Sequence, residues 1–111
     1  ILGAGVAHEL GLGFVPVRKA GKLPGDVLAH HYDLEYGSAT IEVHADSFTP
    51  GQRVLLVDDV LATGGTAAAA HDLIERAGGR VVSMAFLVEL AFLGGRDRLA
   101  GRSIDSLYLV P

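Results

Sequence analysis

Residues 54–66 read Val-Leu-Leu-Val-Asp-Asp-Val-Leu-Ala-Thr-Gly-Gly-Thr, and this stretch decides the fold class of the chain. The four consecutive aliphatic residues 54–57 predict a strand over 53–59 that is buried on both faces, as in the centre of a parallel sheet. This strand is expected to end in two adjacent carboxylates. The threonines and glycines of 62–66 then predict a loop that leads into the next element.

A helix is expected directly after this loop. Residues 66–77 are rich in alanine, and the pair Gly78-Gly79 predicts the end of the helix. A second buried strand over 81–90 completes a strand–helix–strand unit, whose two strands should be parallel and joined by a right-handed crossover. The sequence therefore predicts an α/β fold.

The remaining segments are shorter. Apolar residues at every fourth position predict a helix that ends at Leu10, and the alternation over 40–44 with a Gly37-Ser38 turn predicts a hairpin over 28–45. The other expected segments are a strand-length apolar run at 13–17, a loop at 18–25, a helical turn at 96–99 and a strand at 104–110. Because the sequence shows no repeat or linker, we expect residues 1–111 to form one domain.

The composition argues against several classes of protein. The chain has 111 residues with 9 Lys+Arg and 13 Asp+Glu, and its formal net charge of −4 argues against binding nucleic acid by bulk charge. It has no cysteine, which excludes disulfides, thiolate zinc sites and a thiol nucleophile within these residues. Charged residues or glycines interrupt the apolar runs well before the ~18 residues that a membrane span needs. We therefore expect a cytoplasmic protein without a membrane partner.

The residues that follow the first buried strand carry the chemistry. Ligands of open α/β sheets lie just past the carboxyl ends of the strands, and the first turn of a helix offers N–H groups to an anion such as phosphate. Gly64 and Gly65 let the backbone approach closely, and the flanking threonines add hydroxyl donors. Asp58 and Asp59 would repel an anion but would accept hydrogen bonds from sugar hydroxyls, or meet a metal held by the substrate. Together these residues predict a ribose 5-phosphate site.

The same stretch resembles the phosphoribosyl-diphosphate signature of the type I phosphoribosyltransferases. Three further stretches are similar to the adenine-specific members of that family: residues 11–25, Tyr32-Asp-Leu-Glu-Tyr-Gly37, and Phe86-Leu-Val-Glu-Leu90 with Gly95-Arg-Asp-Arg-Leu99. The resemblance implies the type I phosphoribosyltransferase fold, in which helices flank a central, mostly parallel sheet and a flexible β-hairpin forms a lid.

An activity follows from the same resemblance. It implies transfer of 5-phosphoribosyl from phosphoribosyl diphosphate to adenine, which gives AMP and pyrophosphate in purine salvage. Mg²⁺ would be bound mainly through the substrate, with no direct metal site on the protein. The enzyme would act as a homodimer.

The resemblance also implies roles for individual residues around the sugar. The 5′-phosphate would be cradled by one loop, whose residues are Ala62, Thr63, Gly64, Gly65 and Thr66. Asp58 and Asp59 would accept hydrogen bonds from the ribose 2′ and 3′ hydroxyls. The pyrophosphate would face three cations, Arg18, Lys19 and Lys22, because positive charge stabilises a leaving diphosphate.

The hairpin matches the mobile loop that closes over the reacting centre in this family. At its tip, Glu35 matches the acidic residue that assists proton transfer at the purine, and Tyr36 belongs to the same lid. A lid of this kind excludes water from an oxocarbenium-like centre that water would otherwise hydrolyse. The residues expected near the base or the ribose are Val60, Leu61 and Glu89.

Family members carry a further segment before the part that matches Ile1. This segment includes an N-terminal hood that forms much of the adenine pocket, and a strand that ends in an arginine contacting pyrophosphate. We expect the hood and this first strand to be absent from residues 1–111. The chain would then be a partial domain that keeps the sugar-phosphate site but is poorly active by itself.

Two other functions fit the same fold. A non-catalytic regulator could bind phosphoribosyl diphosphate, but Glu35-Tyr36, Arg18-Lys19 and the net charge of −4 favour an enzyme. A phosphoribosyltransferase for xanthine, guanine or orotate is the other alternative. The Gly21-Lys-Leu-Pro-Gly25 and Leu34-Glu-Tyr-Gly37 strings favour adenine.

Overall fold

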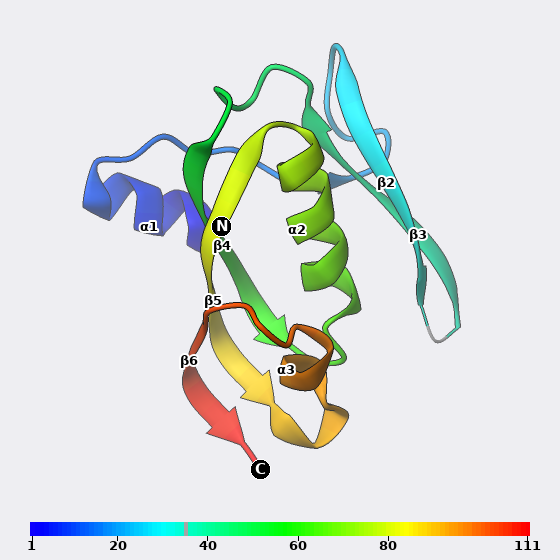
Figure 1. The fold of residues 1–111 in the computed structure, drawn as a ribbon, viewed down its shortest axis with the longest axis vertical. Coiled ribbons are helices and arrows are strands. Elements are labelled where there is room, and N and C mark those ends of the chain that lie inside the picture. The colour runs from blue at the N-terminus through cyan, green and yellow to red at the C-terminus, as the bar shows by residue number, and fades with distance from the viewer. Residues whose placement is uncertain (35) are drawn as a thin grey trace.

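The computed structural model describes residues 1–34 and 36–111 of the chain. These residues form two three-stranded sheets, and helix α2 packs between them (Figure 1). In chain order the elements are α1 (Leu2–Leu10), β1 (Arg18–Lys19), β2 (Val27–Leu34), β3 (Gly37–His44), β4 (Gln52–Leu61), α2 (Gly65–Arg76), β5 (Gly79–Leu90), the 3₁₀ turn η1 (Ala91–Leu93), α3 (Gly95–Arg98) and β6 (Ile104–Val110).

Strands β4, β5 and β6 form a parallel sheet with β5 in the middle. The predicted strand–helix–strand unit is confirmed as β4–α2–β5. However, β4 runs past the two aspartates, because Val60 and Leu61 go on pairing with Val88 and Glu89 of β5. The predicted end of this strand at residue 59 is therefore two residues short.

The predicted burial of β4 is wrong for part of the strand. Within the described residues β4 lies at the edge of the sheet, next to β5, and not in its centre. Leu56 packs toward α2, and Val57 lies near Gly3 of α1, which is on the other side of the strand (Figure 1). Leu55 remains 40% exposed. The aliphatic run thus marks burial against α2, whereas α1 covers only part of the opposite face.

The second sheet has the antiparallel order β1-β3-β2. The predicted hairpin is confirmed, with pairing from Val27↔His44 to Leu34↔Gly37. Its predicted turn at Gly37-Ser38 is wrong, because these two residues begin β3 and pair with Leu34 and Asp33. The predicted strand-length run at 13–17 forms no strand, because Pro16 has no N–H to donate to a ladder. Instead Val15 and Val17 pack their side chains against the core. The segment predicted as a loop supplies the short strand β1, whose two residues pair with β3.

Helix α2 fits between the two sheets because its buried positions are mostly small. One side of the helix packs Ala69, Ala70 and Leu73 against Ile41 and Val43 of β3. The other side packs Ala67 in a cluster with Leu61, Met84, Phe86 and Leu99. The helix begins at Gly65 and ends at Arg76, each one residue before its predicted position. These two contacts fix where the first turn of α2 stands relative to the end of β4.

Among the helices of the described residues, we find none with the length and the apolar character that crossing a bilayer requires.

Candidate functional site

A pocket of about 250 Å³ lies where β4 ends and α2 begins. One continuous stretch lines it, residues 58–67. The structure therefore brings together the two aspartates and the whole predicted phosphate loop. Val60 and Leu61 lie in the same lining, with Val60 41% exposed and Leu61 buried.

The loop offers backbone donors to an anion. Gly64 has φ +87°, in the left-handed region that favours glycine, and this turns the chain into α2 at Gly65. No side chain caps the helix at Gly64. The N–H groups of the first turn have no partner within a helix, so they and the partial positive charge of the helix end suit a phosphate. The exposed Thr63 and Thr66 add two hydroxyls.

Asp58 and Asp59 stand at the strand side of the pocket. The N–H of Asp59 donates to Oδ1 of Asp58 at 2.9 Å, and the N–H of Val60 donates to Oδ1 of Asp59 at 2.8 Å. These contacts hold the two carboxylates in place while leaving further lone pairs for hydroxyl donors. Burial is the largest influence on Asp58 and raises the pKa of its carboxyl, and the neighbouring Asp59 charge also raises it, while the Asp59 N–H opposes both.

The structure does not bring the predicted pyrophosphate residues into this pocket. Arg18 and Lys19 lie exposed on β1, opposite Glu42 and Ile41 of β3, and Lys22 is exposed in the turn that follows. Their predicted role is not tested by this arrangement. Tyr36, at the hairpin tip, is 98% exposed. Glu35 lies outside the described residues.

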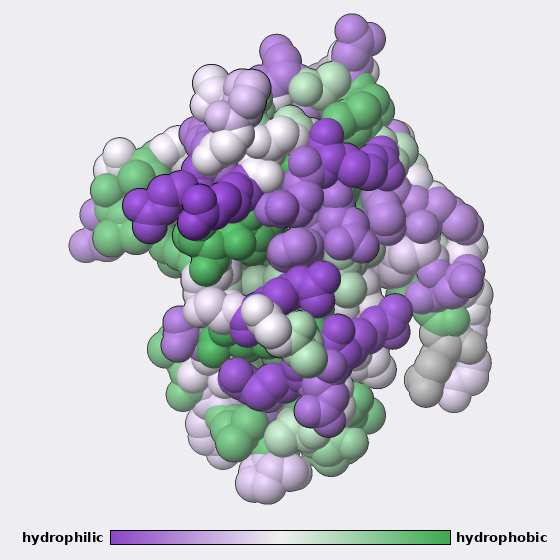
Figure 2. Space-filling model, viewed as in Figure 1, coloured by the Kyte–Doolittle hydropathy of each residue, from purple (hydrophilic) through white to green (hydrophobic). Residues whose placement is uncertain are grey.

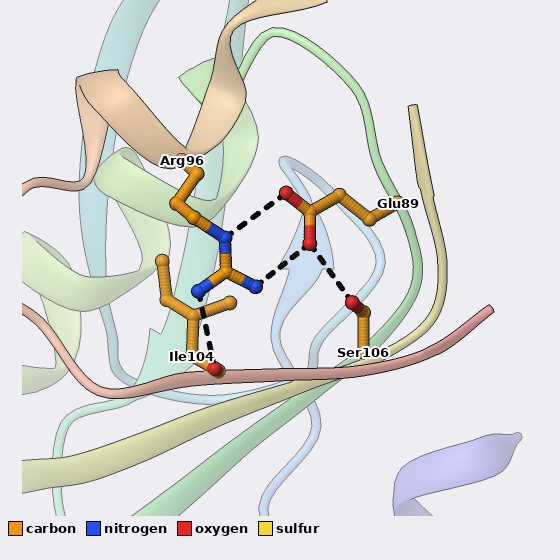
Figure 3. A network of polar contacts seen from close by, with 4 residues as sticks. All are labelled: Glu89, Arg96, Ile104 and Ser106. Atoms are coloured by element: carbon orange, nitrogen blue, oxygen red, sulfur yellow. Dashed lines mark hydrogen bonds and ion pairs between the residues drawn. The ribbon is translucent and has the colours of Figure 1, made fainter. Parts of the chain in front are cut away.

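Glu89 is buried, being only 4% exposed, but it does not line the pocket. Its Oε2 accepts from Nε of Arg96 at 3.1 Å, and its Oε1 accepts from Nη2 of Arg96 at 2.7 Å and from the Ser106 hydroxyl at 2.8 Å (Figure 3). The bonds from Arg96 lower the pKa of Glu89 most strongly, against the opposing effect of burial. The predicted place of Glu89 near the base or ribose stays a prediction.

Sequence reasoning missed Tyr32, Arg96 and Ser106. Tyr32 lies on β2, and its hydroxyl is 3.3 Å from that of Thr66 in the pocket. Because a buried carboxylate needs a hydrogen-bond partner, the expected burial of Glu89 was the only feature of the sequence that pointed to a cation such as Arg96. The pairing itself depends on how α3 folds back over the sheet.

No group of three or more His, Cys, Asp or Glu side chains arranged to hold a metal ion occurs in residues 1–34 and 36–111. The donor set at the pocket is therefore the pair Asp58 and Asp59. Mg²⁺ commonly takes one or two carboxylates together with phosphate oxygens of a substrate, so this pair fits a metal that is shared with a ligand.

Comparisons with known proteins agree with this geometry. Residues 1–105 match the family model of the phosphoribosyl transferase domain. The chain is 62% identical over 110 residues to the adenine phosphoribosyltransferase of Thermobifida fusca, a match that covers 99% of this chain and 62% of that protein.

Solved structures show the same likeness. The crystal structure of adenine phosphoribosyltransferase from Thermoanaerobacter pseudethanolicus superposes with a TM-score of 0.94 at 54% identity, covering 97% of this chain and 63% of that one. The Saccharomyces cerevisiae enzyme, complexed with an imino-altritol bisphosphate and adenine, superposes with a TM-score of 0.90 at 43% identity, covering 96% and 60%.

The chain thus spans about three fifths of the length of these relatives. Its predicted type I phosphoribosyltransferase fold is confirmed, as is its resemblance to the adenine-specific members. Because the family model covers nearly all of the chain and the pocket has the matching donors, this chain belongs to the phosphoribosyl transferase domain family.

Proposed function

We propose that the chain is the phosphoribosyl-diphosphate-binding part of an enzyme that transfers 5-phosphoribosyl to adenine, releasing pyrophosphate and giving AMP for purine salvage. The observation that carries this proposal is the pocket of residues 58–67, in which phosphate donors and hydroxyl acceptors face one cavity. The adenine specificity of the relatives supports the choice of base.

The sugar-phosphate end of the substrate is bound by this pocket. The loop residues Ala62, Thr63, Gly64, Gly65 and Thr66 hold the 5′-phosphate with backbone N–H groups and two hydroxyls. Asp58 and Asp59 accept hydrogen bonds from the ribose 2′ and 3′ hydroxyls. Fixing both ends of the ribose orients C1′ for attack by the purine nitrogen.

Mg²⁺ enters as a companion of the substrate. It would be held mainly by oxygens of the ligand, and Asp58 and Asp59 are the carboxylates of the pocket that would face it. When bound, Mg²⁺ neutralises charge on the diphosphate leaving group.

The reaction breaks the bond between C1′ and the diphosphate oxygen and forms a bond between C1′ and the purine nitrogen. Arg18, Lys19 and Lys22 stabilise the departing diphosphate. Glu35 assists removal of the proton from the purine nitrogen, and Tyr36 closes the lid beside it. Val60 and Leu61 lie in the vicinity of the base or the ribose. Glu89, which pairs with Leu61 in the sheet, lies behind them without touching the ligand.

We further propose a homodimer in the cytoplasm. Large apolar side chains are exposed on and after α1, where Figure 2 shows hydrophobic residues gathered: Leu2, Leu10, Leu12 and Phe14 are each 40–60% exposed. Surfaces of this kind favour association with another protein surface. Light scattering of the purified protein distinguishes a dimer from a monomer.

The test is an assay of the protein that carries this chain, with adenine, phosphoribosyl diphosphate and Mg²⁺, following AMP by chromatography. We expect AMP to form with adenine, no nucleoside monophosphate to form with guanine, xanthine or orotate, and AMP formation to stop when a chelator removes Mg²⁺. Binding of phosphoribosyl diphosphate without turnover would instead support the regulator. Product with another base would overturn the adenine specificity.

A further inference from the structure

The phosphate loop rests directly on the backbone of α3. A Cβ on Gly64 would stand 2.9 Å from the carbonyl oxygen of Gly95, and a Cβ on Gly95 would collide with the carbonyl oxygen of Ala62. The same added atom on Gly95 would also stand 2.9 Å from Cδ1 of Leu61. Contacts this close leave no room for a side chain, so the position of Gly95 sets the position of the loop.

The residue after Gly95 anchors α3 to the sheet. Arg96 donates two hydrogen bonds to the buried Glu89 of β5, at 2.7 and 3.1 Å, and its Nη1 lies 3.4 Å from the carbonyl oxygen of Ile104 on β6. Ser106 of β6 donates to the same carboxylate at 2.8 Å (Figure 3). The carboxylate therefore joins β5, β6 and α3 at a single point.

A buried carboxylate with an arginine partner contributes little to the stability of a fold by itself. Burying a carboxylate has a large desolvation cost, which an ion pair and its hydrogen bonds offset only when their geometry is good. A two-pronged contact between a planar guanidinium and a carboxylate does, however, define both distance and direction. The network is thus suited to fixing the place of α3, and with it Gly95.

We propose that Glu89, Arg96 and Ser106 are positioning residues, which act through Gly95 to hold the backbone of Ala62–Gly65 where it binds the phosphate group of the phosphoribosyl substrate. This proposal rests on the proposed function of the loop. On this proposal, Glu89 affects binding of the substrate's phosphate group and not binding of the base.

Glu89→Gln and Ser106→Ala test the network, and Gly95→Ala tests the contact itself. The matched control is Glu75→Gln, because the Glu75 carboxylate accepts a hydrogen bond from the Val81 N–H at 2.7 Å near the opposite end of β5. The readouts in the whole protein are the KM for phosphoribosyl diphosphate, the KM for adenine, the melting temperature, and the ¹H–¹⁵N shifts of the Gly64 and Gly65 amides with and without ribose 5-phosphate.

We expect Gly95→Ala to raise the KM for phosphoribosyl diphosphate by about 100-fold, and Glu89→Gln by about 10-fold, since a misplacement of ~1 Å costs up to about 10²-fold. Ser106→Ala should give a smaller rise. The KM for adenine should stay within about 2-fold, and the amides of Gly64 and Gly65 should shift before any ligand is added. Glu75→Gln should lower the melting temperature without either effect.

The proposal is overturned if Glu89→Gln and Ser106→Ala lower the melting temperature as Glu75→Gln does, yet leave unchanged both the KM for phosphoribosyl diphosphate and the shifts of the Gly64 and Gly65 amides. Should Gly95→Ala fail to fold, these two variants still decide the question. Failure of the proposed function would be recognised separately, because the unaltered protein would then not bind ribose 5-phosphate. In that case, a shift of the Gly64 and Gly65 amides in the ligand-free variants would still show that the network fixes the position of the loop.

Discussion

The hydroxyl of Tyr32 on β2 lies 3.3 Å from the hydroxyl of Thr66 in the first turn of α2. This contact joins the hairpin to the loop for which we propose phosphate binding. When Tyr32 donates to Thr66, the Thr66 proton remains available for a phosphate oxygen, because each hydroxyl carries one donor. Tyr32 is therefore placed to orient a hydroxyl of the proposed phosphate site, although it lies outside the lining of the pocket.

Tyr32→Phe should accordingly weaken substrate binding without unfolding the protein. The ring still packs against the core cluster that contains Ile41 and Leu73, so the melting temperature should hardly change. The KM for phosphoribosyl diphosphate should rise by about 2–10-fold, which corresponds to the ~0.5–1.5 kcal/mol of one hydrogen bond. Tyr108→Phe is the matched control, because Tyr108 lies on β6 and is 65% exposed. An equal KM for both variants would contradict the role of Tyr32.

The two aspartates should matter far more to catalysis. Replacing both, as Asp58→Asn with Asp59→Asn, should lower kcat/KM by about 10–1000-fold, or ~1.4–4 kcal/mol in total. This is less than the ~3–6 kcal/mol of two lost charge-assisted hydrogen bonds to the ribose, because Asn keeps an acceptor oxygen. Steady-state kinetics with phosphoribosyl diphosphate as the varied substrate measures the loss. Asp46→Asn, in the exposed turn after β3, serves as the control. Unchanged kinetics in the double variant would refute the sugar-binding role.

Asp58 should also reduce the stability of the fold at neutral pH. Its pKa is raised above the ordinary value of 3.8, first because the carboxyl is partly buried. The folded chain therefore binds this proton more tightly than the unfolded chain, so the favourable contribution is complete below pH 3.8 and is lost as the pH rises through the folded pKa. Asp58→Asn keeps an acceptor for the Asp59 N–H and carries no charge.

Urea unfolding at neutral pH should thus find Asp58→Asn more stable than the unaltered protein, and the difference should vanish below pH 3.8. A variant that loses activity while gaining stability is expected where a site tolerates strain for function. If Asp58→Asn were less stable than the unaltered protein by the same amount at every pH, the charge of the Asp58 carboxylate would not reduce the stability of the fold.

The residues that line the pocket could be found from the sequence because they follow one another in the chain. Ten successive residues, 58–67, line it, and the pattern of a buried strand, paired glycines and a helix start is contained within them. The hairpin was predictable for the same reason, since the alternating residues and Gly37 lie side by side in the chain, although Gly37 begins β3 rather than forming the turn. Features set by neighbours in sequence leave a readable pattern.

Features set by distant neighbours left no such pattern. Leu55 was expected to be buried, but its exposure depends on how much of β4 is covered by α1. The pairing of Arg18 with Glu42 turned a glycine-punctuated loop into a strand. The partner of Glu89 lies on α3, and only the fold-back of that helix decides that Arg96 rather than another cation meets it.

Glu89 gives the opposite pH behaviour from Asp58. Its pKa lies below the ordinary value of 4.5, chiefly because of the hydrogen bonds from Arg96. The folded chain binds this proton less tightly than the unfolded chain, so the stabilisation is complete above pH 4.5 and is lost as the pH falls through the folded pKa. Glu89→Gln should therefore lower the free energy of unfolding by about 1.5–3 kcal/mol at neutral pH, the range for hydrogen bonds to a charged group. Urea titrations of both proteins should show this difference shrinking as the pH falls below 4.5, and a difference independent of pH would mean that the Glu89 charge contributes nothing.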